Sequence, residues 1–208
     1  MDDIRLTAMA VSLLLRYPDE AGLKVHAKVQ QQLPQLPALV SAELEEFFAR
    51  TRQLGPVGLQ EHYVETFDQR RRCSLNLSYY AVGDTRQRGA ALLAFRQQLE
   101  ALGVEEISDE LPDHLCVVLE ALALADPTVT EQAVSMVASH RDGIEVLRSA
   151  LADVASPYVH VISALCLVLP EMDQATINRY VNLIRQGPPA EMVGLDTTSL
   201  PFPTAVPN

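Results

Sequence analysis

Residues 109–126, DELPDHLCVVLEALALAD, join an acidic, proline-containing run to a strongly apolar one. The apolar positions recur at three- and four-residue steps, as on one face of an α-helix: Leu115, Val118, Leu119 and Leu122. Ser108 or Asp109 can cap this helix, Pro112 is tolerated in its first turn, and the helix ends before Pro127. The stretch therefore predicts a buried helix around which the rest of the chain is organised.

Helical spacing continues on both sides of this stretch, interrupted by Pro, Gly and capping Ser or Asp residues. Helices are expected over residues 4–16, 20–33, 39–54, 58–67, 84–102, 128–139, 143–153, 157–169 and 174–186. Residues 75–82 alternate only briefly, which favours a loop or a short helix over a strand. We therefore predict an all-α fold, a single compact bundle of about nine to ten helices over residues 1–186.

The last part of the chain differs in composition. Residues 187–208, GPPAEMVGLDTTSLPFPTAVPN, contain five prolines and no helical spacing. Such a segment is expected to be an extended or disordered tail. Its apolar residues leave open whether it docks on the helical domain.

The chain is acidic, because 27 Asp and Glu residues outnumber 16 Lys and Arg and give a formal net charge of −11. This charge disfavours the phosphate backbone of nucleic acids and favours a cationic protein or peptide partner. The same composition is explained equally well if the acidic residues serve only to keep the protein soluble. The apolar fraction of 48% is that of an ordinary globular protein with a sizeable core.

The cysteines and the N-terminus indicate a cytoplasmic location. Cys73, Cys116 and Cys166 form no CxxC pair and are expected to be buried free thiols, which suits a reducing compartment. The chain starts MDDIRL, with two acids where a secretory signal carries basic residues. Its longest apolar runs are shorter than the roughly 20 residues of a membrane-spanning helix. We therefore expect a soluble cytoplasmic protein without direct membrane insertion.

Motifs of known enzyme chemistry do not occur in this sequence. It contains no HExxH, GxSxG, phosphate loop or dinucleotide fingerprint, and its five histidines are scattered. Acids precede His62 and His114, but neighbours on a helix point about 100° apart and form no dyad by adjacency alone. We predict no catalytic residue and no metal site.

Charged residues gather between the apolar segments. Five arginines lie within residues 70–88, namely Arg70, Arg71, Arg72, Arg86 and Arg88. These arginines need no binding function if they lie on a solvated surface and form ion pairs with Asp68 and Asp84. The acids Asp109, Glu110 and Asp113 are equally explained by the positive end of the following helix.

Residues 63–95, YVETFDQRRRCSLNLSYYAVGDTRQRGAALLAF, together with ELPDHL at residues 110–115, resemble the nitrate reductase assembly chaperones. This is the NarJ or delta-subunit family, within the wider group of TorD-like chaperones for molybdoenzymes. LLLRYPDE at residues 13–20 also resembles the first helix of that family and its proline stop. The chain departs from the family pattern at Val82, Cys116 and Ala121, which affects local packing.

The resemblance implies an all-helical chaperone that is neither an enzyme nor a subunit of the mature complex. Such proteins bind the catalytic (alpha) subunit of respiratory nitrate reductase, including its N-terminal peptide. They do so in the cytoplasm while the molybdenum cofactor and an iron-sulfur cluster are inserted. The chaperone itself keeps no cofactor, and proteins that deliver the molybdenum cofactor are further candidate partners.

Carried onto this chain, the resemblance predicts a client-peptide groove between the helix that starts near Asp109 and the segments around residues 63–71 and 83–88. Its candidate residues are Tyr63, Phe67, Asp68, Arg70, Arg71, Asp84, Arg86, Arg88, Glu110, Pro112, Asp113, His114 and Leu115. Tyr63, Phe67 and Leu115 would form the apolar lining. Glu110 and Asp113 would meet positive groups of the client, and the charge of His114 would tune release near neutral pH. The arginines would contact the client's folded body or order the loop by pairing with Asp68 and Asp84.

Three alternatives stay open at this point. The first is a chaperone of the same fold for another molybdoenzyme, such as a dimethyl sulfoxide or trimethylamine oxide reductase. The second is an enzyme that uses Asp113 and His114, and the third is a helical scaffold that binds no client peptide. The sequence does not give the oligomeric state.

Overall fold

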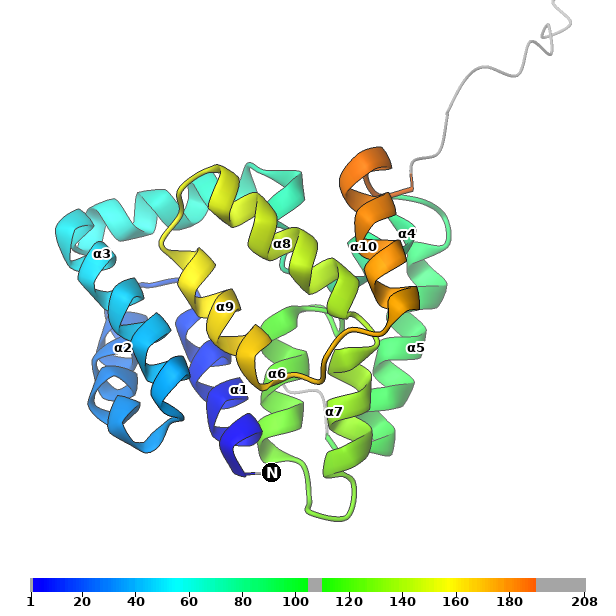
Figure 1. Ribbon diagram of the computed structural model, residues 1–208, viewed down its shortest axis with the longest axis horizontal. Helices are drawn as coiled ribbons and strands as arrows, with labels where there is room; N and C mark the ends of the chain where they lie inside the picture. The colour runs from blue at the N-terminus through cyan, green and yellow to red at the C-terminus, as the bar shows by residue number, and fades with distance from the viewer. Residues whose placement is uncertain (1, 105–109, 190–208) are drawn as a thin grey trace, which may run out of the picture.

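The computed structural model describes residues 2–104 and 110–189, and these residues form a helical bundle (Figure 1). The first five α-helices are α1 (Asp2–Leu14), α2 (Glu20–Gln32), α3 (Ala38–Tyr63), α4 (Leu77–Val82) and α5 (Arg88–Ala101). The other five are α6 (Leu115–Leu124), α7 (Thr130–Ala138), α8 (Arg141–Asp153), α9 (Tyr158–Val168) and α10 (Gln174–Gln186). Three short elements connect them: the 3-10 helices η1 (Leu33–Gln35) and η3 (Arg71–Cys73) and the π-helix η2 (Val64–Asp68). The predicted all-α fold is confirmed.

Helices α1, α6 and α9 form the centre of the bundle. Helix α1 packs against both α6 and α9, α3 and α8 pack on α9, and α10 packs on α8 (Figure 1). Helix α6 is apolar on nearly all sides, so it is buried rather than half-exposed. The predicted stripe Leu115, Val118, Leu119 and Leu122 is at most 1% exposed.

Helix α6 begins later than the sequence indicated. Its first residue is Leu115, and His114 is the N-cap with extended backbone (φ −67°, ψ 131°). Pro112 therefore lies in the turn ahead of the helix and not in its first turn. The predicted caps Ser108 and Asp109 lie outside the described residues. The turn stays out of the helix because its backbone pairs with the segment before α4: Leu115 N–H donates to the carbonyl of Leu75 (2.8 Å).

The two helices expected on either side of Gly55 are merged into one bent element. Gly55 has left-handed backbone (φ 68°, ψ 176°), and Pro56 follows as the first residue of the second half. This position tolerates a positive φ because glycine has no Cβ, and proline needs no hydrogen-bond acceptor at a helix start. The second half runs into the π-helix η2, which widens the last turn before Gln69.

The remaining boundaries agree with the predictions to within a few residues. Residues 77–82 form the short helix α4, and α5 begins at Arg88 rather than directly after Asp84 or Thr85. The Thr85 hydroxyl oxygen still accepts a hydrogen bond from Gln87 N–H (3.3 Å) in the preceding turn. Helix α10 ends at Gln186, and the predicted tail lies outside the described residues from residue 190 onward.

The cysteines are free, with Cys73 and Cys116 buried and Cys166 half-buried. In the described parts of the chain, none of the helices combines the length and the apolar character needed to cross a bilayer.

Candidate binding pocket

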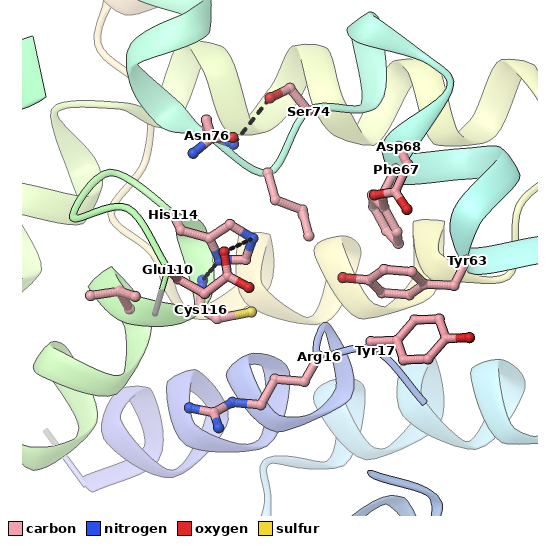
Figure 2. Close-up of a pocket in the computed structure, with 12 residues that line it drawn as sticks. Arg16, Tyr17, Tyr63, Phe67, Asp68, Ser74, Asn76, Glu110, His114 and Cys116 are labelled. Atoms are coloured by element: carbon pink, nitrogen blue, oxygen red, sulfur yellow. Dashed lines mark hydrogen bonds and ion pairs between the residues drawn. The ribbon is translucent and has the colours of Figure 1, made fainter. Parts of the chain in front are cut away.

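A cavity of about 530 Å³ opens where four segments meet. The segments are the residues that follow α1, the junction of α3 with η2, the residues before α4, and the turn with the first residues of α6 (Figure 2). From the predicted set the lining includes Tyr63, Phe67, Asp68, Glu110 and His114. The other lining residues are Arg16, Tyr17, Ser74, Leu75, Asn76, Cys116 and Val117. The structure thus brings together five of the thirteen predicted residues.

One wall of the pocket is aromatic. The Tyr63 ring packs edge-on against Tyr17 (centroids 5.4 Å apart) and lies 4.8 Å from Phe67. Behind them, Tyr158 of α9 packs against Phe67 at 4.9 Å. The Tyr63 hydroxyl donates to the carbonyl of Leu15 (3.0 Å), and burial raises the pKa of this phenol. The rings therefore form a fixed, neutral apolar surface.

The opposite wall is polar and comes from the turn before α6 (Figure 2). His114 Nδ1 accepts a hydrogen bond from the Cys116 backbone N–H (3.3 Å), and its Nε2 lies 4.0 Å from Glu110 Oε2. The Glu110 side chain is 60% exposed, whereas that of His114 is 12% exposed. Burial lowers the pKa of His114 even though Glu110 and Asp113 oppose this shift. The lowered pKa favours the neutral imidazole in this structure, and a change in the charge of His114 during client release stays a prediction.

Asp113 does not face the pocket. It is 0% exposed, and its carboxylate accepts hydrogen bonds from Ser78 Oγ (2.6 Å), Ser78 N (3.2 Å) and Asn76 Nδ2 (3.0 Å). Pro112 and Leu115 are also buried and do not line the cavity. In this structure the carboxylate of Asp113 is thus already occupied and cannot meet a positive group of a client, contrary to the expectation. Its role is to hold the turn against α4.

The predicted residues of the second charged segment lie outside the pocket. Asp84 forms ion pairs with Arg71 (Nη1 to Oδ2, 3.4 Å) and with Arg88 (Nη1 to Oδ1, 3.0 Å). Arg70 and Arg86 are exposed and do not line the cavity. Two roles were considered for the arginines, namely contact with the client's folded body and ordering of the loop. The ion pairs of Arg71 and Arg88 with Asp84 are of the kind expected for loop ordering.

Several lining residues were not singled out from the sequence. Tyr17 directly precedes the Pro18 that stops the first helix, so the sequence indicates its position at a helix end. Its contact with Tyr63 could not be predicted, because Tyr63 is far along the chain. Arg16, next to Tyr17, pairs with Glu120 of α6 (2.6 Å). Residues 74–76 belong to the family-like stretch 63–95, but they were not predicted to line the groove.

Catalytic and metal chemistry find no support in the described residues. These residues contain no group of three or more His, Cys, Asp or Glu placed to hold a metal ion. His62 Nε2 lies 2.8 Å from Ser156 Oγ, as in a nucleophile–base pair, but Ser156 is 0% exposed. Its Oγ also accepts from Tyr158 N–H (3.3 Å) at the start of α9, so the serine has a structural explanation. Burial raises the pKa of the Cys116 thiol to about 12, which makes it a poor nucleophile.

The fold and the pocket together define an all-α protein with a preformed cavity between an aromatic wall and a polar wall. The chain belongs to the nitrate reductase delta subunit family, which matches residues 29–164. The family predicted from the sequence resemblance is thereby confirmed.

Curated relatives agree with this assignment. The chain is 31% identical over 175 residues to the probable nitrate reductase molybdenum cofactor assembly chaperone NarJ of Bacillus subtilis, covering 80% of this chain and 90% of that protein. It is 35% identical over 116 residues to the nitrate reductase molybdenum cofactor assembly chaperone NarJ of Escherichia coli, covering 54% and 49%. It is also 35% identical over 155 residues to the nitrate reductase-like protein NarX of Mycobacterium tuberculosis, where 74% of this chain spans only 23% of the relative's length.

Proposed function

We propose that this protein is a cytoplasmic assembly chaperone, and not an enzyme, that acts on respiratory nitrate reductase. It binds the catalytic (alpha) subunit, including its N-terminal peptide, while the molybdenum cofactor and an iron-sulfur cluster are inserted and before the complex reaches the membrane. Membership of the delta subunit family and the names of the Bacillus and Escherichia relatives support this function. In the mycobacterial relative, a similar stretch is part of a much longer protein named nitrate reductase-like.

The observation that carries the proposal is the pairing of an aromatic wall with carboxylates in one preformed pocket. Tyr17, Tyr63 and Phe67 offer apolar faces, and Asp68 and Glu110 stand at the same cavity. A peptide that combines apolar and basic side chains satisfies both walls, because aromatic faces attract apolar groups and cations while carboxylates pair with Lys or Arg. We infer that the N-terminal segment of the client binds here.

The charge of the whole chain favours the same ligand. A net charge of −11 attracts a cationic peptide over distances of about one Debye length, roughly 10 Å at 0.1 M salt. Binding should therefore weaken as salt is added. Asp113 and His114 act in this proposal as positioning residues, since they fix the turn that presents Glu110.

The experiment that tests the proposal is calorimetric titration of the protein with a synthetic peptide that covers the N-terminal segment of the alpha subunit from the same organism. We expect the Asp68→Asn/Glu110→Gln double variant to bind about tenfold more weakly, which corresponds to about 1.4 kcal/mol. A Phe67→Ala variant should bind at least as weakly, because it removes an apolar anchor from the other wall. The circular dichroism spectrum of each variant shows whether it remains folded.

A matched control separates the pocket from the overall charge. Glu45 and Glu131 are exposed and outside the pocket, so a Glu45→Gln/Glu131→Gln variant loses the same charge and should bind the peptide almost as the native protein does. Equal weakening in both double variants would exclude the pocket as the binding site. No binding by the native protein would exclude peptide recognition altogether. Tighter binding of the corresponding peptide from a dimethyl sulfoxide or trimethylamine oxide reductase would favour the alternative client.

A further inference from the structure

The π-helix η2 forms the part of the pocket wall that carries Phe67 and Asp68. The Gln69 N–H donates a hydrogen bond to the carbonyl of Val64, five residues earlier (3.2 Å). In an α-helix the corresponding bond joins residues four apart. Turns of the π type are rare and occur frequently at functional sites. The geometry of η2 therefore decides which of its side chains reach the pocket.

The wider turn brings Asp68 to the same side as Tyr63. Successive residues of an α-helix are about 100° apart, so residues five apart point about 140° away from each other. In a π-turn a backbone hydrogen bond joins residues five apart, which brings them to nearly the same side. Tyr63 and Asp68 are five apart, and both line the cavity (Figure 2). An α-helical turn would keep Phe67 beside Tyr63 and would point Asp68 away from the pocket.

Behind η2, three polar side chains connect this turn to the residues before α9. We use the name His62 cluster for His62, Thr66 and Ser156. His62 Nε2 lies 2.8 Å from Ser156 Oγ and 3.2 Å from Thr66 Oγ1. Thr66 is 1% exposed and Ser156 is 0% exposed, so these contacts are shielded from water. The imidazole ring also stacks on Tyr158 with an interplanar angle of 4°.

Ser156 is held in place by the backbone on both sides. Its N–H donates to the carbonyl of Leu151 (2.9 Å), and its Oγ accepts from the Tyr158 N–H (3.3 Å). Ala155, directly before it, has a positive φ of 51°, which is uncommon for a residue other than glycine. A left-handed residue at this place closes α8 in the way that glycine commonly closes a helix. The anchor of the His62 cluster is therefore set by contacts outside η2.

We propose that the His62 cluster keeps η2 in its π-helical geometry and thereby presents Asp68 to the client. Because π-turns are rare, contacts outside the backbone must favour this one. His62, Thr66 and Ser156 do not line the cavity, so they act on a ligand only through the turn and are positioning residues. This inference rests on the proposed function, since the client is the alpha-subunit peptide assigned to the pocket.

The position of Asp68 gives the cluster an effect on specificity. Its carboxylate lines the cavity together with the rings of Tyr63 and Phe67. A Lys or Arg side chain of the client can contact the aromatic faces and pair with the carboxylate at the same time. With an α-helical turn the rings would remain and the carboxylate would be lost. The His62 cluster therefore determines whether the aromatic wall prefers a basic residue over an apolar one.

The first measurement uses the full chain without any peptide. A nuclear Overhauser effect between the Val64 Hα and the Gln69 amide proton reports the π-turn, because these protons approach each other only when residues five apart are bonded. The native protein and His62→Gln should show it, since the glutamine amide offers polar atoms to both hydroxyls. His62→Phe keeps an aromatic ring against Tyr158 but removes the polar atoms, so the effect should disappear. Thr66→Val should act in the same way and provides a second variant if His62→Phe folds poorly.

Calorimetric titration with the alpha-subunit peptide measures the consequence for binding. Asp68→Asn alone should weaken binding about threefold, which is half, in free energy, of the tenfold change expected when Glu110→Gln is added. In a Thr66→Val background the same change should have almost no effect, because Asp68 then points away from the ligand. Thr51→Val is the matched control. It removes another buried hydroxyl of α3, which donates to the Phe47 carbonyl (3.0 Å), and should leave the threefold effect intact.

Three results would overturn the proposal. The first is an Overhauser effect that persists in both His62→Phe and Thr66→Val. The second is an equal effect of Asp68→Asn in the native and Thr66→Val backgrounds, and the third is loss of that effect in the Thr51→Val background. If the native protein binds no peptide, the proposed function fails, and the Overhauser measurement still decides whether the His62 cluster fixes the turn.

Discussion

Replacing Asp113 by alanine should destabilise the protein more than any other single change in the turn before α6. The carboxylate of Asp113 accepts hydrogen bonds from the Ser78 hydroxyl and backbone N–H, and Ser78 is 1% exposed. Alanine leaves both donors buried without an acceptor, at about 1–3 kcal/mol each, so we expect a loss of roughly 4 kcal/mol. This is a large part of the 5–15 kcal/mol that typically stabilises a folded domain.

Urea unfolding followed by far-ultraviolet circular dichroism measures this loss as a lower midpoint. A thermal scan should show a melting temperature about 8–16 °C lower, given 2–4 °C per kcal/mol for a domain of this size. Asp113→Asn retains one acceptor oxygen and should lose about half as much stability. Glu110→Ala, at an exposed side chain three residues away, should change the free energy of unfolding by less than about 0.5 kcal/mol.

A loss below about 1 kcal/mol in Asp113→Ala would refute the reasoning, because the two serine donors would then have found other partners. If the variant folds too poorly for titration, Ser78→Ala provides the second measurement. It removes the hydroxyl donor and leaves the backbone N–H bond, so it should cost about 1–2 kcal/mol.

The other predictions concern packing and pH. Gly143→Ala should lower stability by about 1–3 kcal/mol in urea unfolding, because a Cβ there would lie 2.9 Å from the Tyr80 side chain. The matched change Gly89→Ala, where a Cβ meets nothing within 4 Å, should be neutral or slightly stabilising. Burial lowers the pKa of His26 to about 4. Between about pH 6.5 and pH 4 the unfolded chain therefore binds a proton at His26 that the native state does not bind. The free energy of unfolding falls as the pH drops through this range. His26→Phe should remove about 2.4 kcal/mol of this decrease when unfolding free energies at pH 7 and pH 4.5 are compared, and an unchanged decrease would contradict the assignment.

The helices could be predicted because their apolar spacing is a local property. Leu115 and Leu122 identify the buried face of α6, and Pro127 limits its end, without knowledge of any other segment. The start of α6 could not be predicted in the same way. Asp113 is a good residue for a first helical turn, yet it bonds to Ser78, 35 residues earlier in the chain. This long-range contact prevails over the local preference.

The pocket was only partly predictable for the same reason. Tyr63 and Glu110 were singled out because they stand in recognisable motifs, and the structure places both at the cavity. Tyr17 was missed because its place beside Tyr63 depends on how α1 packs in the bundle. The arginines were grouped with the pocket because they share its motif region, although Asp84 holds two of them at a separate face. Proximity in sequence indicated the region, and packing divided it into two surfaces.

The chain of rings from Tyr17 through Tyr63 and Phe67 to Tyr158 has an optical consequence. The protein contains six tyrosines and no tryptophan, and two of the six line the pocket. Tyrosine transfers its excitation to a nearby indole, so a bound peptide that carries one tryptophan would dim the tyrosine emission and brighten its own. The pocket therefore contains an intrinsic fluorescent reporter, and its occupancy can be followed without attaching a dye to the protein.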